Sequence, residues 1–171
     1  MRSAFEPAEL FGVVLKNRIA MAPMTRSRAY GEGQTPGPDT AEYYAQRTGA
    51  GMIVTEGLHP NVHGQGEPDT PGLYSAAQAA AWRPVTAAVR RPGTLFFAQL
   101  MHSGRVSHPA NNPHGLRPVA PSAVTAPGTI YTHEGLRPHP EPRALGVAEV
   151  EQTVRDFAAA AKLALDAGFG G

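Results

Sequence analysis

Residues 52–57, MIVTEG, form a short and nearly continuous apolar run that ends in a charged residue and a glycine. Two further runs are of the same kind, RIAMAPM at residues 18–24 and LFFAQLM at residues 95–101. None of the three alternates cleanly between apolar and polar residues, as a half-exposed antiparallel strand would. The three runs are therefore predicted to be strands of a parallel sheet whose two faces are both covered.

A helix-forming segment, residues 39–48, lies between the first and second runs. It begins with Asp39 and Glu42 in the spacing of a capping box, in which two side chains bond to free backbone N–H groups of the first turn. Gly49 and Gly51 follow directly and favour the end of a helix. The sequence therefore predicts a short helix capped by Asp39.

A second helix-forming segment, residues 75–91, lies between the second and third runs. Ser75 and Gln78 have the same capping-box spacing. Pro84 falls inside the segment, where a proline removes a helical hydrogen bond and costs about 3 kcal/mol or more unless the helix bends or restarts. We therefore expect a helix with a bend near Arg83.

The clearest helical pattern covers residues 147–167. Glu149 and Glu151 favour a helix N-terminus in its first turn, and Gly168 favours its end. Apolar residues at helical spacing predict a buried face made of Val150, Val154, Phe157, Ala161 and Leu165.

Strands and helices thus alternate along the chain, which predicts a parallel α/β sheet, either open and doubly wound or closed into a barrel. A closed barrel of eight βα units typically needs about 250 residues. A chain of 171 residues would hold only the first half of one, with three parallel strands and their helices, ending before a fourth strand. In both architectures the ligand site lies at the carboxyl ends of the strands. This sequence places mostly polar residues there: Thr25, Arg26, Glu56, Gly57, Gln99, His102 and Arg105.

Composition and charge exclude several classes of protein. The chain carries 15 Lys and Arg against 14 Asp and Glu, without the basic stripe that nucleic-acid binding needs. It has no cysteine, and its histidines lack familiar ligand spacing, so we expect no bound metal. No apolar run approaches the roughly 20 residues that span a bilayer, and no signal-like run follows Met1. We therefore expect a cytoplasmic protein with neither a membrane nor a nucleic-acid partner.

Six stretches together match one family in order and spacing. They are LKNRIAMAPMTRSR (residues 15–28), AEYYAQRT (41–48), AGMIVTEG (50–57), QLMHSGRVSHP (99–109), PVAPSA (118–123) and the closing AGFGG (167–171). With them the chain resembles the N-terminal half of Old Yellow Enzyme-type NAD(P)H:flavin oxidoreductases, in particular the bacterial N-ethylmaleimide reductase group. The resemblance implies a (β/α)8 TIM barrel that holds FMN at its carboxyl face. Residues 1–171 would then be the incomplete N-terminal part of that single domain.

The resemblance also implies cofactor-binding roles for five residues. It places Pro23, Met24 and Thr25 beside the flavin, near its N5 atom and C4 carbonyl. Gly57, which has no Cβ atom, would let the flat ring approach the backbone. The Gln99 amide, with donors and an acceptor, would bind the N3–H and C2 carbonyl edge. Without the resemblance, an ordinary turn is the better explanation of Pro23 and Thr25, and a plain strand-end glycine is the better explanation of Gly57. A core amide bonded to backbone explains Gln99 as well as a ligand contact does.

Met101 and Glu67 stand where relatives of this group usually carry tryptophan and tyrosine, and the resemblance implies that both line the substrate pocket. Methionine is smaller and more flexible than tryptophan, and a carboxylate repels anionic substrates. We therefore expect this protein to prefer different alkenes from its relatives. In the family, the pair that grips the substrate carbonyl and the tyrosine proton donor come after the position of Gly171, so no catalytic residue is expected in this chain.

Two functions remain open on these grounds. The first is an FMN-dependent ene-reductase that passes hydride from NADPH or NADH through FMN to the activated C=C bond of an α,β-unsaturated carbonyl compound, with its catalytic second half absent from this chain. The alternative is a truncated, inactive half-barrel that folds or binds FMN only with a complementary half or in a homo-oligomer. An open flavodoxin-like domain is disfavoured, because MTRSRAYGEGQTP (residues 24–36) replaces the phosphate-binding loop after the first run.

Overall fold

The centre of the fold is a small parallel sheet. The computed structural model describes residues 3–10, 12–90 and 93–171. The sheet contains three strands in the spatial order β3 (Ala20–Met21), β4 (Met52–Leu58) and β5 (Leu95–Leu100). Both strand pairs are parallel, and Met52 lies opposite both Ala20 and Leu95. The three predicted strands are confirmed, although only two residues of the first apolar run pair with β4.

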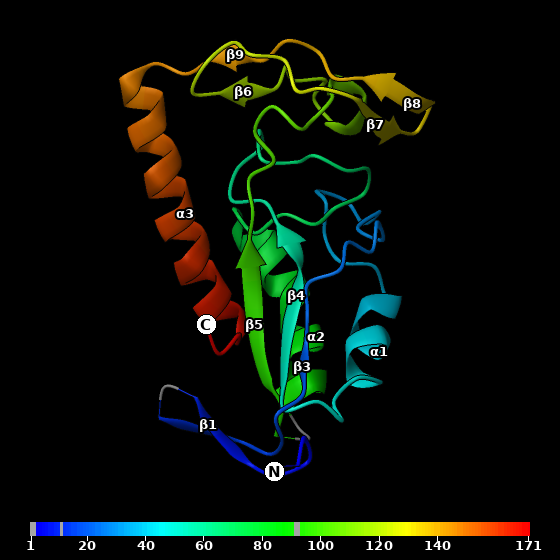
Figure 1. The fold of residues 1–171 in the computed structure, drawn as a ribbon, viewed down its shortest axis with the longest axis vertical. Coiled ribbons are helices and arrows are strands. Elements are labelled where there is room, and N and C mark those ends of the chain that lie inside the picture. Colours follow the sequence, from blue (N-terminus) through cyan, green and yellow to red (C-terminus); the bar gives the residue numbers. More distant parts are fainter. Residues whose placement is uncertain (1–2, 11, 91–92) are drawn as a thin grey trace.

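The helices follow the predicted order along the chain and lie around this sheet (Figure 1). They are α1 (Asp39–Ala45), α2 (Ala76–Arg90) and α3 (Val147–Ala167). The first helix ends three residues earlier than predicted, because residues 46–48 form turns. The predicted end of the second helix, Arg91, lies outside the described residues.

The two predicted capping boxes have different outcomes. In α2 the box is confirmed, since the Gln78 backbone N–H donates to Ser75 Oγ at 3.2 Å and the Ser75 N–H donates to Gln78 Oε1 at 3.1 Å. In α1 the predicted cap was wrong. Asp39 is the first helical residue rather than the cap, and its carboxylate instead accepts a bond from the Tyr30 hydroxyl at 3.0 Å. The second helix continues through Pro84 without a restart.

The predicted buried face of α3 was wrong. Val154 and Leu165 are 66% and 61% exposed, whereas Ala160, Ala164 and Ala167 are buried. The physical reason is that this helix approaches α2 closely, where only small side chains fit. The Thr86 hydroxyl of α2 reaches the Ala167 carbonyl at 2.7 Å. The predicted stop at Gly168 is confirmed by its left-handed φ of 96°, which glycine adopts without steric cost.

The sequence did not predict the short strands outside the central sheet. Two antiparallel hairpins form, one from β1 (Ala8–Leu10) and β2 (Val13–Leu15) and one from β7 (Thr129–Thr132) and β8 (Gly135–Pro138). A third pair, β6 (Val119–Ala120) and β9 (Arg143–Ala144), is parallel. Figure 1 shows β1 at the amino-terminal end of the central sheet and β6 to β9 as a layer beyond its carboxyl-terminal end.

Aromatic rings form the core between the sheet and the helices. Phe96 of β5 lies with its ring centroid 5.1 Å from that of Tyr44 and 4.9 Å from that of Phe169, and Trp82 lies 5.5 Å from Phe169. Phe169 directly precedes two glycines that bond to β5: the Gly170 N–H donates to the Phe96 carbonyl at 2.8 Å. Residues 170 and 171 thus cover part of the edge of β5.

No helix among the described residues is long and apolar enough to cross a membrane.

Candidate functional site

The carboxyl ends of β4 and β5 bring two of the predicted site residues together. Gly57 and Gln99 lie directly opposite each other in the sheet register. The register shifts between Val54 and Gly57, so the regular ladder is interrupted just before this pair. Such irregularities are common beside functional sites, because they change the direction of neighbouring side chains.

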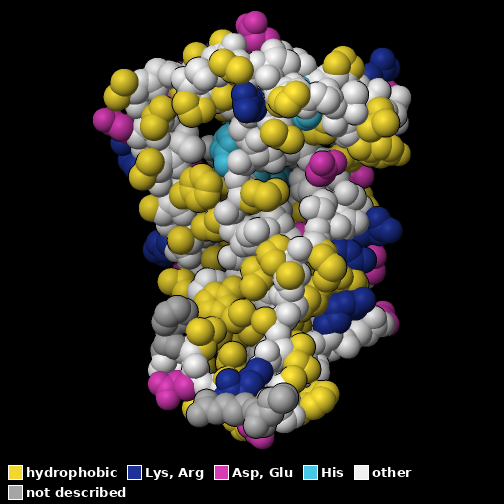
Figure 2. Space-filling model, in the orientation of Figure 1, with side chains coloured by type: hydrophobic (Ala, Val, Ile, Leu, Met, Phe, Trp, Pro, Cys, Tyr) yellow, Lys and Arg dark blue, Asp and Glu magenta, His cyan; other side chains and the backbone are white. Residues whose placement is uncertain are grey.

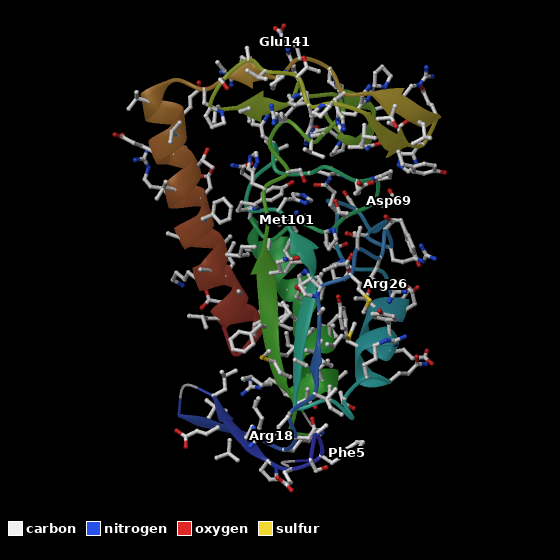
Figure 3. All side chains as sticks on the ribbon, viewed as in Figure 1. Phe5, Arg18, Arg26, Asp69, Met101 and Glu141 are labelled. Atoms are coloured by element: carbon white, nitrogen blue, oxygen red, sulfur yellow. The ribbon has the colours of Figure 1, made fainter. Side chains whose placement is uncertain are left out.

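Gly57 is buried, and Met101 packs against it. A Cβ atom built on Gly57 would stand 2.5 Å from Met101 Cε and 3.1 Å from Met101 Sδ. The Met101 side chain is 37% exposed and extends from the end of β5 (Figure 3). The flat face of Gly57 is therefore accessible to a ligand only where the flexible methionine gives way.

The Gln99 side chain has the chemistry of a ligand-binding amide. Its backbone N–H donates to Thr55 Oγ1 at 3.0 Å, which fixes the main chain. Its side-chain amide forms no hydrogen bond with any residue that the structure describes, although it lies half-buried in an apolar strand. A polar amide in such a place needs partners, and here only solvent or a ligand can supply them.

Pro23, Met24 and Thr25 follow β3 in an irregular segment, and all three are exposed. The next residue is bonded to β4, since the Arg26 backbone N–H donates to Glu56 Oε2 at 3.1 Å. Glu56 directly precedes Gly57. The structure thus ties the end of β3 to the end of β4.

Glu56 was predicted only as one of several polar residues at the strand ends, and its central place was missed. It is 3% exposed, and burial raises its pKa to about 7, against the opposing effect of the bond from Arg26. The sequence does contain a sign of this role, because Glu56 is a carboxylate inside an otherwise apolar strand. A buried carboxylate requires polar partners, as the half-buried amide of Gln99 does.

Glu67 lies half-buried in the loop after β4, and its carboxylate forms no hydrogen bond or ion pair within the described part of the chain. The same loop is bonded to the loop after β5: the Ser103 N–H donates to the Gly64 carbonyl at 3.0 Å, and Ser107 Oγ donates to the Gln65 carbonyl at 2.6 Å. The loops that carry Glu67 and Met101 are therefore held together, without a direct bond between these two side chains.

A polar cavity of about 130 Å³ lies farther out, between these loops and α3, and His63, His102 and Asp156 contribute to its lining. Burial lowers the pKa of both histidines. His102 Nδ1 accepts a bond from the Gly104 N–H, so the neutral ring carries its proton on Nε2. Figure 2 shows histidine side chains in the upper part of this face. Among the described residues, no three His, Asp or Glu side chains come together as a metal site.

These features fit one face of a flavin site. The flat surface over Gly57, the unbonded Gln99 amide opposite it and the exposed segment that contains Thr25 all lie at the carboxyl ends of adjacent parallel strands. A flat, partly polar ring needs such a surface together with donors and acceptors at its edge.

Known proteins match this chain over nearly its whole length. The model of the NADH:flavin oxidoreductase / NADH oxidase family matches residues 3–171. The 12-oxophytodienoate reductase 7 of Oryza sativa subsp. japonica is 39% identical over 171 residues, which cover 98% of this chain and 43% of that protein.

Solved structures are also similar to this chain over nearly its whole length. The old yellow enzyme homologue from Zymomonas mobilis has a TM-score of 0.93 at 44% identity, with 99% of this chain and 47% of that one covered. Morphinone reductase in complex with tetrahydroNAD has a TM-score of 0.89 at 39% identity, with 99% and 48% covered.

The chain spans less than half the length of these relatives. Its three parallel strands and their helices correspond to the first half of a (β/α)8 barrel, which confirms the predicted fold. The resemblance to Old Yellow Enzyme-type flavin oxidoreductases is confirmed as well. The chain belongs to the NADH:flavin oxidoreductase / NADH oxidase family.

Proposed function

We propose that residues 1–171 form the N-terminal part of a single FMN-binding barrel domain and supply one face of its flavin site. The observation that carries this proposal is the pairing of Gly57 with Gln99 at the carboxyl ends of β4 and β5. There a glycine that is covered by the flexible Met101 side chain lies opposite an amide that has no bond within the described part of the chain.

FMN, when bound, supplies a hydride carrier between NADPH or NADH and the activated C=C bond of a small α,β-unsaturated carbonyl compound. This chain's residues bind and orient the ring. The Gln99 amide offers donors and an acceptor to its polar edge, Gly57 admits its face, and Pro23, Met24 and Thr25 border it from β3. Met101 and Glu67 lie on the substrate side, where a methionine and a carboxylate favour neutral alkenes over anionic ones.

The groups that bind the substrate carbonyl and donate the proton come, in this proposal, from the part of the relatives' fold that these 171 residues do not span. The coverage of 43% to 48% of the relatives supports this division. The isolated chain is then inactive as a reductase, while the protein that contains a whole barrel is an ene-reductase.

A second candidate is a half-barrel that binds FMN only together with a complementary half or in a homo-oligomer. The exposed apolar residues of α3 favour it, in particular Val150, Val154 and Leu165. Figure 2 shows hydrophobic side chains gathered over much of one face of the molecule. Exposed apolar surface of this kind marks places where other protein surfaces pack.

The test is a titration of FMN with the 171-residue chain, followed by visible absorption and flavin fluorescence. We expect a perturbed spectrum and quenching, and we expect Gln99→Leu to weaken binding while Gln46→Leu, at an exposed position, leaves it unchanged. If the folded chain binds FMN only after the rest of the barrel is added, the second candidate holds. If a protein with the whole barrel binds no FMN, or binds equally well with Gln99→Leu, the proposal is wrong.

A further inference from the structure

A buried carboxylate joins two of the strand ends that form the candidate site. Glu56 of β4 accepts a hydrogen bond at Oε2 from the Arg26 backbone N–H, at 3.1 Å. Arg26 directly follows Thr25 in the segment after β3. That segment has no regular secondary structure, and this bond ties its backbone to β4.

The first helix holds Glu56 from the other side. The Glu56 backbone N–H donates to the Tyr44 hydroxyl at 3.0 Å, and that hydroxyl lies 3.5 Å from Glu56 Oε1 as a donor. Tyr44 is completely buried in the aromatic core. Glu56 is therefore fixed at its backbone and at both carboxylate oxygens, and three elements meet on it: the end of β3, β4 and α1.

The surroundings of Glu56 are positively charged. Arg26, labelled in Figure 3, stacks its guanidinium on the Tyr43 ring, with Cζ 3.2 Å from the ring centroid. Its buried Nη1 atom has no hydrogen-bond partner among the described residues. Arg26 and, more weakly, Arg28 act on the Glu56 carboxylate through space. These are the charged groups that face Glu56 from the β3 side, and Tyr44 faces it from α1.

We propose that Glu56 is a positioning residue, whose ionised carboxylate holds the Arg26 amide and thereby keeps Thr25 at the edge of the flavin site. A bond from an N–H to a carboxylate is roughly twice as strong as one to a neutral acceptor. Protonation of Glu56 therefore loosens the segment 23–26. Only the link to the flavin rests on the proposed function.

Burial holds the pKa of Glu56 near 7, so the strength of this bond changes within the neutral pH range. The Arg26 amide proton reports this change directly, since a stronger hydrogen bond moves its NMR signal downfield. The first test follows the amide signals of Thr25 and Arg26 between pH 5 and pH 9 in the 171-residue chain.

In the wild type we expect the Arg26 amide signal to move downfield as the pH rises, with one transition near pH 7. The transition disappears in Glu56→Gln, which keeps the size of the side chain but does not ionise. It persists in the control Glu42→Gln, at an exposed position on α1. An Arg26 amide that does not titrate, or that titrates equally in Glu56→Gln, overturns the proposal.

A second variant covers the case in which Glu56→Gln does not fold. Tyr44→Phe keeps the ring in the core but removes the hydroxyl, whose hydrogen bond lowers the pKa of Glu56. The Arg26 transition then moves to higher pH. An unshifted transition in Tyr44→Phe contradicts the proposed network.

The flavin part is tested separately, by the dissociation constant of FMN between pH 5 and pH 9. We expect the affinity of the wild type for FMN to increase as the pH rises through 7. In Glu56→Gln we expect the affinity to be weaker and independent of pH. If a protein with the whole barrel binds no FMN, with or without these substitutions, the proposed function fails while the Arg26 titration still decides the role of Glu56. If FMN binds to Glu56→Gln with the wild-type pH profile, the flavin link is wrong.

Discussion

The Met101 side chain lies directly over Gly57, so that a Cβ atom added to Gly57 would stand 2.5 Å from Met101 Cε. The contact joins the end of β5 to the end of β4 and covers Gly57 at the proposed flavin surface. It also separates two effects of substitution at Gly57. The nearest atom belongs to the flexible end of a partly exposed side chain, so the fold can adjust, while the flat surface itself is lost.

Gly57→Ala is therefore expected to weaken FMN binding about fivefold or more, since overpacking at a close contact costs roughly 1–3 kcal/mol. The free energy of unfolding changes less, because Met101 moves aside. Gly49→Ala is the matched control: a Cβ atom there meets nothing within 4 Å. Fluorescence titration with FMN and urea unfolding give both quantities. Equal FMN affinity in the two variants would count against a flavin surface at Gly57.

Glu56 is expected to make the chain less stable as the pH rises. Burial raises its pKa from 4.5 to about 7 in the folded state. The folded state then binds this proton more tightly than the unfolded state, so the free energy of unfolding falls between pH 4.5 and pH 7. Glu56→Gln abolishes that fall, which amounts to about 3 kcal/mol at most. Urea unfolding at pH 5 and pH 8, with Glu42→Gln as the control, measures it; an unchanged difference between the two pH values contradicts the buried acid.

His59 is expected to act in the opposite direction. Burial, with a smaller contribution from His102, lowers its pKa from 6.5 to about 4. The stability that depends on its neutral ring is present above pH 6.5 and is lost as the pH falls toward 4. His59→Gln reduces this acid destabilisation, whereas His114→Gln, at an exposed position, does not. Thermal unfolding from pH 4 to pH 7 distinguishes them, and equal acid sensitivity of both variants would refute the assignment.

Substitutions on α3 test its corrected orientation. Leu165→Ala is expected to change the free energy of unfolding by less than about 0.5 kcal/mol, because Leu165 is largely exposed. Ala164→Leu, one residue away on the buried face, is expected to destabilise the fold by about 1–3 kcal/mol through overpacking. Urea unfolding of both variants measures the two changes in the free energy of unfolding. A larger destabilisation by Leu165→Ala than by Ala164→Leu would mean that the face predicted from hydrophobicity is the buried one.

Trp82 tests the aromatic core. Trp82→Ala is expected to cost about 3–5 kcal/mol, because the ring is completely buried against Tyr44 and Phe169. Trp82→Phe costs clearly less, since it keeps an aromatic ring and removes an indole N–H that has no partner among the described residues. A phenylalanine variant as unstable as the alanine variant would mean that the indole N–H has an unseen partner.

The strands were predictable because a buried parallel strand is visible in the sequence as a short apolar run, such as residues 52–57. The box at Ser75 and Gln78 was predictable because its two bonds are local. The buried face of α3 was not, since periodicity favours large apolar residues while close helix packing selects alanines. The hairpins depend on turns such as that at Gly135, whose positive φ is not visible from composition.

In the candidate site, too, some features could be predicted from the sequence and others could not. Gly57 and Gln99 could be placed at strand ends from the sequence, but their direct pairing depends on a register shift after Val54. The role of Glu56 depends on its hydrogen bonds with Arg26, 30 residues away in the sequence, and with Tyr44, 12 residues away. Such tertiary contacts leave no local pattern.

A map of backbone amide signals during titration of the ¹⁵N-labelled chain with FMN shows whether the carboxyl ends of β3, β4 and β5 contact FMN. We predict that the largest shifts fall on Thr25, Gly57 and Gln99 and that the β1–β2 hairpin is unaffected. Shifts that cluster on that hairpin or on the exposed face of α3, with none at the strand ends, would contradict the account.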